Sequence, residues 1–302
     1  MLPLLKPPGP TSQRVVGWLR ARLPRGWRVG HAGTLDPGAA GVLAVCLGPA
    51  CRLADYLHLP PKSYRCDLVL GVETDTQDAA GTPGLRASAA ELDAACVSAA
   101  LQGMRGELEL PVPAFSARHY RGERLYVYAR RGEAVPLPLA AGAVYRFELL
   151  DWQPGEVARA RCCVVCSSGT YVRSLCAEAG RRLGVGGHMD ALIRTSAAGI
   201  EASSSWTLEE IGAALQHGTF ARHLLQPSDA LRFLPQRVLD PGDADGIRYG
   251  RPPGRQRQTA ADRDGPVRLL DGGGRLLAVA RCSCTDGVCV WSLERVLVSP
   301  PQ

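Results

Sequence analysis

The chain has 302 residues, of which 46% are hydrophobic, so it can form one large domain and a small one with a sizeable core. It contains no run of eighteen apolar residues and no apolar signal segment, which excludes the membrane-spanning and secreted classes, and we expect a cytoplasmic protein. The net charge of +6 permits contact with a polyanion without requiring it.

The first half of the chain alternates helical and strand patterns. A helix is expected to begin at Thr11 or Ser12, either of which can cap it, and alternating apolar residues after Lys62 are typical of a strand. The expected helices span 11–23, 50–58 and 88–103, and the expected strands span 41–47 and 63–72.

The second half continues in the same way up to about residue 235. Strands are expected at 143–150 and 157–166, and a helix at 171–183. Thr207, followed by Glu210 three residues later, predicts a capping box that opens a helix at 207–216.

Composition changes after residue 235. The segment 241–266 is rich in Gly, Pro, Asp and Arg, and a Gly272-Gly273-Gly274 turn separates two short strand patterns that follow it. Together with a third, these patterns span 267–271, 276–281 and 288–293. We therefore expect an α+β body over 1–235 and a small all-β module over 236–302.

The eleven cysteines are expected to be reduced thiols. Only one C-x-x-C pair, Cys163 and Cys166, occurs, whereas a structural zinc site needs four ligands at suitable spacing. The other cluster, Cys282, Cys284 and Cys289, has no histidine close by. We interpret these residues as small hydrophobic side chains and expect no metal.

Of the 35 basic residues, 33 are arginine, a bias typical of a GC-rich genome, so arginine abundance alone is weak evidence for RNA binding. The two lysines, Lys6 and Lys62, are therefore more informative, because a compact ammonium was kept at these positions.

One carboxylate lies in an unusually constrained turn. Asp36 belongs to the segment Gly30–Pro37 (GHAGTLDP), in which glycines permit unusual backbone angles and Pro37 keeps Asp36 out of the helical region. An Asp in such a place either forms the turn or does chemistry.

Several segments share their identity and order with one known family. They are KPPGPTS at 6–12, GHAGTLDPGAAGVLAVCLG at 30–48, KSYR at 62–65, PVPAFSARHYRGERLYVYARRGE at 111–133, VCSSGTYVRSL at 165–175 and HMDALIRTSAAGI at 188–200. The chain resembles the TruB family of pseudouridine synthases, and its last part resembles the family's PUA-like RNA-binding appendage. The resemblance implies an α+β pseudouridine synthase fold with a mixed, largely antiparallel sheet.

The resemblance also implies a reaction, the isomerisation of uridine to pseudouridine in the T-loop of tRNA, with no cofactor and no metal. It assigns Asp36 as the catalytic carboxylate, Tyr64 as the aromatic that stacks on the flipped uracil, and Arg173 as the cation that holds Asp36. One carboxylate suffices because no external water has to be activated. A nucleosidase, which would release free uracil, is disfavoured because no second carboxylate is evident.

We expect RNA contacts at six residues: His31, Lys62, Lys6, Arg118, Arg124 and Arg194. The resemblance implies the contact of His31, the basic density of 118–131 favours those of Arg118 and Arg124, and Lys6 is expected mainly to position its motif. The basic segments 118–131 and 248–257 suit a phosphate backbone, although either could be a solvated surface. Leu5, Gly38-Ala39-Ala40 and Ala117-Arg118-His119 depart from the family's usual residues and leave the fine substrate preference open. A tRNA-binding folding chaperone, or an enzyme acting on another RNA, are the alternatives.

Overall fold

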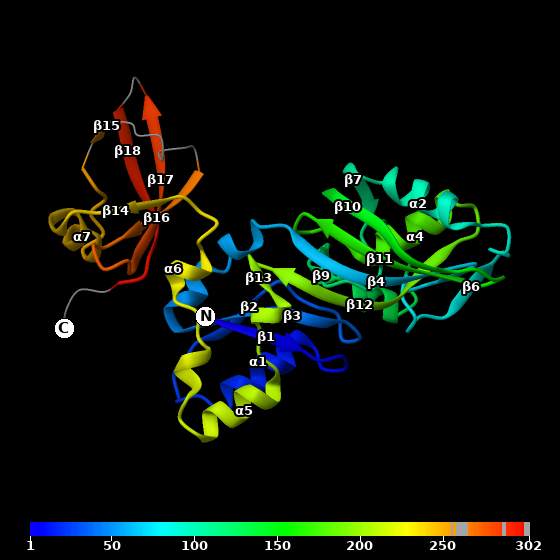
Figure 1. Ribbon diagram of the computed structural model, residues 1–302, viewed down its shortest axis with the longest axis horizontal. Helices are drawn as coiled ribbons and strands as arrows, with labels where there is room; N and C mark the ends of the chain where they lie inside the picture. The colour runs from blue at the N-terminus through cyan, green and yellow to red at the C-terminus, as the bar shows by residue number, and fades with distance from the viewer. Residues whose placement is uncertain (255, 258–264, 286–287, 299–302) are drawn as a thin grey trace. The chain divides into compact units, whose positions relative to one another are not determined.

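The computed structural model describes residues 1–254, 256–257, 265–285 and 288–298. The chain divides into two compact units, drawn as ribbons in Figure 1. The first unit contains Met1–Asp36, Val42–Pro60 and Ala197–Gln302, and the second contains Pro37–Gly41 and Pro61–Ser196. The domain boundary expected near residue 235 falls inside the first unit and stays a prediction.

The N-terminal part of the first unit is a helix packed on three strands. Strands β1 (Leu2–Lys6) and β2 (Val29–Ala32) both pair with β3 (Ala40–Leu47). Helix α1 (Ser12–Arg20) begins as expected, because the Thr11 hydroxyl accepts a hydrogen bond from Arg14 N. Its apolar face joins one core with the strands, which includes Leu2, Leu4, Val15, Val16, Leu19, Leu43 and Val45.

The helix expected at 50–58 is wrong. Two short 3₁₀ turns, η1 (Gly48–Leu53) and η2 (Tyr56–His58), occupy this segment. Pro49 at the start of η1 has no backbone N–H to donate. In η2, His58 N donates to Asp55 O and Leu59 N to Tyr56 O, the spacing of three residues that is typical of a 3₁₀ turn. The chain returns to this unit through β13 (Ile200–Glu201), η3 (Ala202–Ser204), α5 (Leu208–Gln216), η4 (Phe220–His223) and α6 (Pro227–Ala230).

Helix α5 confirms the predicted capping box. Thr207 Oγ1 accepts from Glu210 N at 3.2 Å, and Glu210 Oε2 accepts from Thr207 N at 2.8 Å. This reciprocal pair fixes the first turn, and the buried Ile211 then joins the core beneath α1.

The C-terminal part of the first unit forms a five-stranded sheet in the order β14-β16-β17-β18-β15. Its strands are β14 (Gln236–Val238), β15 (Gln256–Arg257), β16 (Gly265–Leu270), β17 (Leu276–Thr285) and β18 (Val288–Val296). The expectation of an all-β module is wrong in one respect: helix α7 (Pro241–Arg248) lies at the start of the segment rich in Gly, Pro, Asp and Arg. Asp240 caps α7, and Pro241 suits its first position.

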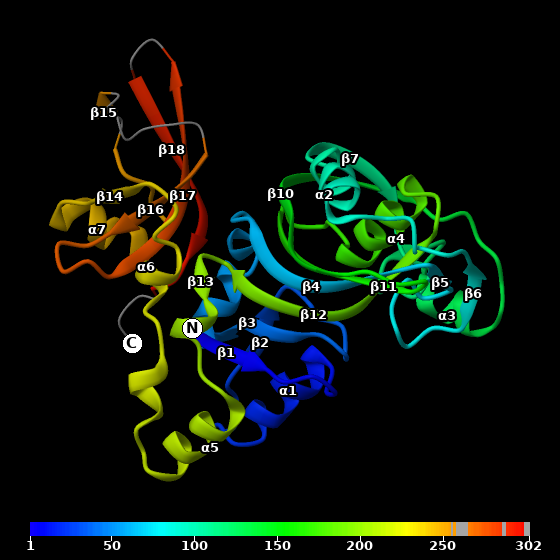
Figure 2. The same ribbon diagram turned by 45° about the vertical axis from the view of Figure 1, so that its right-hand side comes forward.

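This sheet shares a core with the N-terminal part of its unit. Leu270, Leu276 and Val279 pack in one cluster with Val42 and Leu53. At the edge of the cluster Tyr56 donates a 2.8 Å hydrogen bond to Glu294. Figure 2 shows the sheet turned by 45°. The side chains of Cys284 and Cys289, and Arg255 in the basic segment, lie outside the described residues; the nine described cysteines are free thiols.

The second unit is built on an antiparallel sheet with the order β12-β4-β11-β10-β7. The first residues of β3 add a parallel pairing at its β12 edge, where Ala40 and Gly41 oppose Ile193 and Arg194. The mixed, largely antiparallel sheet is therefore confirmed. The strands are β4 (Lys62–Leu70), β7 (Gly106–Pro111), β10 (Leu139–Gln153), β11 (Ala158–Cys166) and β12 (Gly187–Ala197).

Burial alternates along β11, so one face of this sheet is covered and the other is exposed. Helices α2 (Ala94–Gln102) and α4 (Val172–Arg182) pack together and cover the buried face of the sheet (Figure 1). The smaller elements are β5 (Val72–Thr74), β6 (Pro83–Arg86), β8 (His119–Tyr120), β9 (Glu123–Arg124) and α3 (Leu125–Arg130). Among the described helices of both units, none has the length and apolar character needed to cross a membrane.

Candidate active site

The loop that carries Asp36 is held through its neighbour, Leu35. Ser12, the first residue of α1, accepts a 2.9 Å hydrogen bond from Leu35 N and donates a 3.1 Å hydrogen bond to Leu35 O. Ser12 is 1% exposed and the Leu35 side chain is 3% exposed, so this contact is sheltered from water. The backbone immediately before the half-buried Asp36 is therefore fixed in place.

Gly41 fixes the chain after Asp36. Its φ of +108° is a conformation that L side chains rarely adopt. A Cβ at this position would lie 2.7 Å from the backbone nitrogen of Arg194, so only glycine permits β3 to approach β12 this closely. Gly41 therefore acts through its backbone, by allowing this close pairing of strands.

The first unit also holds His31 and Lys6. His31 lies in β2 opposite Val45 of β3 and is partly exposed. Lys6 ends β1 with a side chain that is 1% exposed, and its ammonium donates a 2.9 Å hydrogen bond to Pro7 O. Such burial fits a lysine that positions the KPPGPTS segment.

The second unit brings three of the predicted residues together. Lys62 and Tyr64 are two positions apart in β4, so their side chains lie on the same face of the strand. Arg194 of β12 lies directly opposite Tyr64. The Arg194 side chain is 1% exposed and is hydrogen-bonded to the Tyr64 side chain. The Lys62 ammonium donates a 3.0 Å hydrogen bond to Ser168 Oγ.

This cluster is electropositive and buried. Burial, aided by the charge of Arg194, lowers the pKa of Lys62 to about 8, while the nearby Cys166 opposes the shift. Burial also lowers the pKa of Arg194, and Tyr64 opposes that effect. Two cations held close together away from water favour an anionic ligand, which would relieve their repulsion.

Arg173 occupies the first turn of α4, as the sequence predicted. Its buried guanidinium donates hydrogen bonds of 3.1 Å to Thr76 O and 3.1 Å to Phe115 O. It also lies 3.5 Å from the carboxylate of Asp78. These contacts fix the direction of the guanidinium within the second unit.

Sequence reasoning missed Asp78. The residue accepts hydrogen bonds from the Thr76 hydroxyl at 2.6 Å and from Ala80 N at 3.1 Å, so it braces a tight loop. Gln77 in this loop has a φ of +62° and accepts a hydrogen bond from Ser174 at 3.1 Å. The dense polar run from Thr74 to Asp78 was the only local signal, and it does not reveal that Arg173 is the partner.

The basic segment 118–131 forms a short hairpin followed by a helix. Strands β8 and β9 pair, and Arg124 precedes helix α3. Arg118 and Arg124 are both exposed. Other arginines stack on the segment's own tyrosines: Arg121 on Tyr120, Arg130 on Tyr126 and Arg131 on Tyr128.

Family models match two adjacent stretches of the chain. Residues 20–172 match the N-terminal domain model of the TruB family of pseudouridylate synthases, and residues 173–232 match the tRNA pseudouridylate synthase B C-terminal domain. The tRNA pseudouridine synthase B of Moorella thermoacetica is 41% identical over 286 residues, which cover 92% of each protein. That of Acaryochloris marina is 38% identical over 301 residues, covering 100% of this chain and 99% of the relative.

Solved structures show the same fold. The chain aligns to one from a Cbf5-Nop10-Gar1 complex with a TM-score of 0.74 and 23% identity, covering 99% of this chain and 84% of the other. A chain from an H/ACA RNP bound to a substrate RNA containing 2′-deoxyuridine gives 0.72 and 22% identity, with coverages of 98% and 84%.

Proposed function

Because the chain belongs to the TruB family of pseudouridylate synthases, we propose that it converts uridine to pseudouridine in the T-loop of tRNA. The family and the names of its relatives support an isomerase acting on uridine in tRNA. The T-loop as the target and the roles of individual residues are our proposal.

The reaction needs no second substrate. The bond between N1 of uracil and C1′ of ribose breaks, and a bond between C5 and C1′ forms. C5 loses a proton and N1 gains one, so atoms and electrons balance within one nucleotide. The protein has to supply a group that stabilises the detached uracil or ribose, a surface that holds the base while it turns, and groups that move the proton.

Asp36 is the proposed catalytic carboxylate. The observation that carries this assignment is the pair of hydrogen bonds by which Ser12 fixes Leu35, immediately before Asp36. A fixed backbone limits the freedom of the carboxylate before substrate arrives, and such preorganisation lowers the barrier to attack. The carboxylate would act at C1′ of the sugar or at C6 of the uracil.

Tyr64 is proposed to stack on the flipped uracil. An enzyme that acts on a base within folded RNA must take it out of its stack and hold it against another flat surface. The hydrogen bond with Arg194 fixes the Tyr64 ring. The cations of Lys62 and Arg194 would attract the phosphate of the extruded nucleotide.

Arg173 is proposed to orient Asp36. The resemblance carries this pairing, and the contacts of Arg173 with Thr76 O and Phe115 O support it by giving the guanidinium a fixed direction. A charge-assisted hydrogen bond would keep Asp36 ionised during catalysis.

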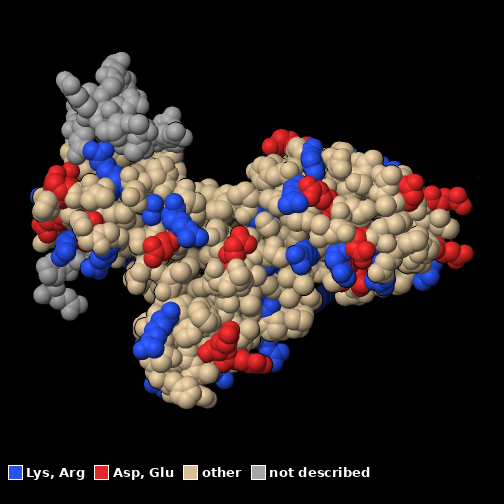
Figure 3. Space-filling model, viewed as in Figure 1, with Lys and Arg blue, Asp and Glu red and all other residues tan. Residues whose placement is uncertain are grey.

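The remaining RNA contacts are proposed for His31, Arg118 and Arg124, while the buried Lys6 is proposed to hold the KPPGPTS segment in place. Basic and acidic side chains are interspersed on the face shown in Figure 3, so we expect RNA on this face to be held by local groups more than by one large basic surface. A cleft of about 1130 Å³ in the first unit is one such place, since Arg28, Arg52 and Arg275 line it beside the exposed Trp27.

The proposal is tested with a T-arm stem-loop that carries tritium at C5 of its uridine. Conversion releases tritium to water and leaves a pseudouridine in the RNA, whereas a nucleosidase would release free uracil. Asp36→Asn should abolish conversion and leave RNA binding intact. Binding of the stem-loop without any conversion by the unaltered chain would support a folding chaperone and contradict the enzymatic proposal.

A further inference from the structure

The turn Ser167–Thr170 connects two parts of the proposed site within the second unit. It follows β11, whose last residue, Cys166, lies opposite Lys62 of β4. Ser168 in the turn accepts the hydrogen bond of the Lys62 ammonium. Helix α4 starts just after the turn and carries Arg173. Any displacement of this turn therefore moves both Ser168, the hydrogen-bond partner of Lys62, and the first turn of α4, which carries Arg173.

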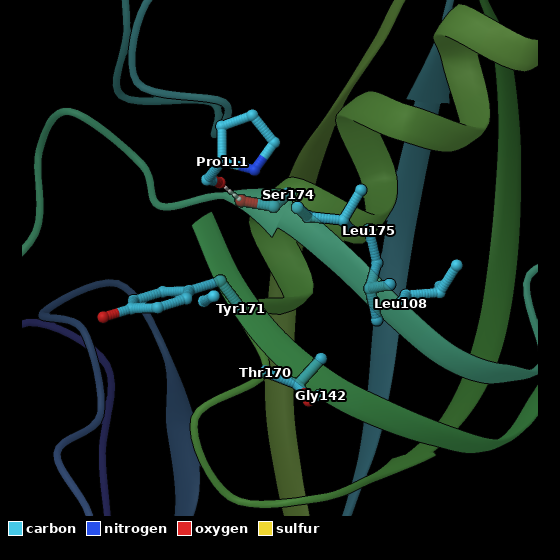
Figure 4. A pocket seen from close by; sticks show the side chains of 9 residues that line it. Leu108, Pro111, Gly142, Thr170, Tyr171, Ser174 and Leu175 are labelled. Carbon is cyan, nitrogen blue, oxygen red and sulfur yellow. Dashed lines mark hydrogen bonds between the residues drawn. The ribbon is translucent and has the colours of Figure 1, made fainter. Parts of the chain in front are cut away.

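The turn is attached to the neighbouring strand β10. Ser167 N donates to Ala143 O at 2.8 Å, and Ser167 Oγ accepts from Ala143 N at 2.9 Å. Ser167 Oγ also lies 3.3 Å from Thr170 Oγ1, at hydrogen-bond distance. One turn later, Ser174 donates to Pro111 O on β7 at 2.9 Å (Figure 4).

Gly142 on β10 makes this close approach possible. A Cβ at position 142 would overlap Thr170 Oγ1 and would lie 3.3 Å from Ser167 Oγ and 3.4 Å from Thr170 Cβ. Gly142 and Thr170 line the same small cavity, together with Tyr171 and Ser174, as Figure 4 shows. The cavity has room for about one water molecule, so Thr170 has little space into which it could move.

We propose that Gly142 is a positioning residue of the active site: its missing side chain seats the Ser167–Thr170 turn on β10 and thereby sets the places of Ser168 and Arg173. The inference rests on the proposed function. A side chain at 142 would push Thr170 away from Ser167 and shift the turn by a few tenths of an ångström or more. Errors of about 1 Å in catalytic geometry can cost on the order of a hundredfold in rate.

The test is Gly142→Ala, measured by tritium release from the T-arm stem-loop. Gly84→Ala is the matched control, because Gly84 also lies in a strand and its Cβ would come no closer than 3.9 Å to Glu73 O. We expect Gly142→Ala to lower kcat by about tenfold or more, with little change in RNA affinity, and Gly84→Ala to leave both unchanged.

A second substitution separates positioning from a general loss of stability. Thr170→Ala removes the atom that the new Cβ would overlap. In that background Gly142→Ala should lower kcat by less than about twofold, because the two changes act through one contact. An equal loss of kcat with and without Thr170→Ala would overturn the proposal, as would a kcat equal to that of Gly84→Ala.

If Gly142→Ala does not fold, Ser167→Ala replaces it. This variant keeps the backbone bond to Ala143 O and loses the two contacts of the hydroxyl. A drop in kcat with retained RNA affinity supports the proposal, and an unchanged kcat overturns it. An unaltered chain without activity would overturn the proposed function and this inference with it, whereas an active chain that tolerates Gly142→Ala overturns this inference alone.

Discussion

Ser12 binds both backbone polar groups of Leu35 with one hydroxyl, accepting from its nitrogen and donating to its oxygen. The two residues are separated by 23 positions in the sequence. The N-terminus of α1 is therefore part of the support of the Asp36 loop.

Ser12→Ala should weaken this support. The substitution leaves the buried N–H and C=O of Leu35 without their hydroxyl partner, so we expect the free energy of unfolding to fall by about 1–3 kcal/mol. We also expect kcat to fall more than RNA affinity, because Asp36 is the adjacent residue. Urea unfolding and tritium release measure the two effects. Ser88→Ala, at an exposed serine, is the control and should change neither quantity.

Asp78→Asn should disturb Arg173 without leaving a cavity beside it. The amide keeps the size of the carboxylate but removes the charge 3.5 Å from the buried guanidinium. We expect kcat to fall about tenfold as Arg173 becomes less well oriented. Asp190→Asn removes a carboxylate that pairs with the exposed Arg159 and should cost less than about 1 kcal/mol, with no loss of rate. Equal behaviour of the two variants would contradict an orienting role for Asp78.

Lys62 should make stability depend on alkaline pH. Its pKa is about 8 in the folded chain, compared with 10.5 when unfolded, so between these values the unfolded state binds the additional proton. The contribution of Lys62 to stability therefore rises as pH increases from 8 to 10.5. We expect the free energy of unfolding of the unaltered chain to rise between pH 7 and pH 10 by about 2–3 kcal/mol more than that of Lys62→Met, which has no group that titrates at this position.

The same titration should weaken RNA binding. Above pH 8 the ammonium becomes neutral and loses its attraction for phosphate, so the affinity of the unaltered chain should fall where that of Lys62→Arg does not. Fluorescence anisotropy with a labelled stem-loop, at constant ionic strength, measures this difference. Parallel pH profiles for the two proteins would show that Lys62 does not contact RNA.

Gly41→Ala should be severe and Gly38→Ala mild, although both glycines follow Asp36 within five residues. At 41 the new Cβ would meet the backbone of Arg194, at a φ of +108°. We expect a loss of about 3 kcal/mol in the free energy of unfolding. At 38 no atom lies within 4 Å of the added Cβ, and the change should stay within about 0.5 kcal/mol. Thermal unfolding of both variants decides between these outcomes.

The sequence predicts best those elements whose signals are local. Thr11 marks the start of α1, and the Thr207–Glu210 pair marks that of α5, because each cap satisfies backbone groups within one turn. Helix α7 had equally local signals in Asp240 and Pro241, which the surrounding Gly and Asp residues obscured. The segment predicted as one helix at 50–58 belongs to two 3₁₀ turns, a difference in hydrogen-bond pattern that apolar spacing does not show.

The site was predictable only in part, since its contacts join distant segments. Asp78 and Arg173 are far apart in the chain, and neither has a neighbour that identifies the other. The support of Lys62 by Ser168 likewise depends on the register of β4 and β11. Family resemblance pointed to Asp36, Tyr64 and Arg173, while the residues that hold the neighbouring groups in place emerged from the three-dimensional structure.

Arg131 illustrates why counting arginines overstates the ionic component of RNA binding. Its guanidinium lies 2.7 Å from Glu123 and 2.8 Å from Glu133, and it stacks on Tyr128. A cation already neutralised by two carboxylates displaces few condensed counterions from a phosphate backbone. When log affinity is plotted against log salt concentration, the slope steepens by about 0.9 for each phosphate neutralised on duplex nucleic acid. This slope should therefore change little in Arg131→Gln and more in Arg124→Gln.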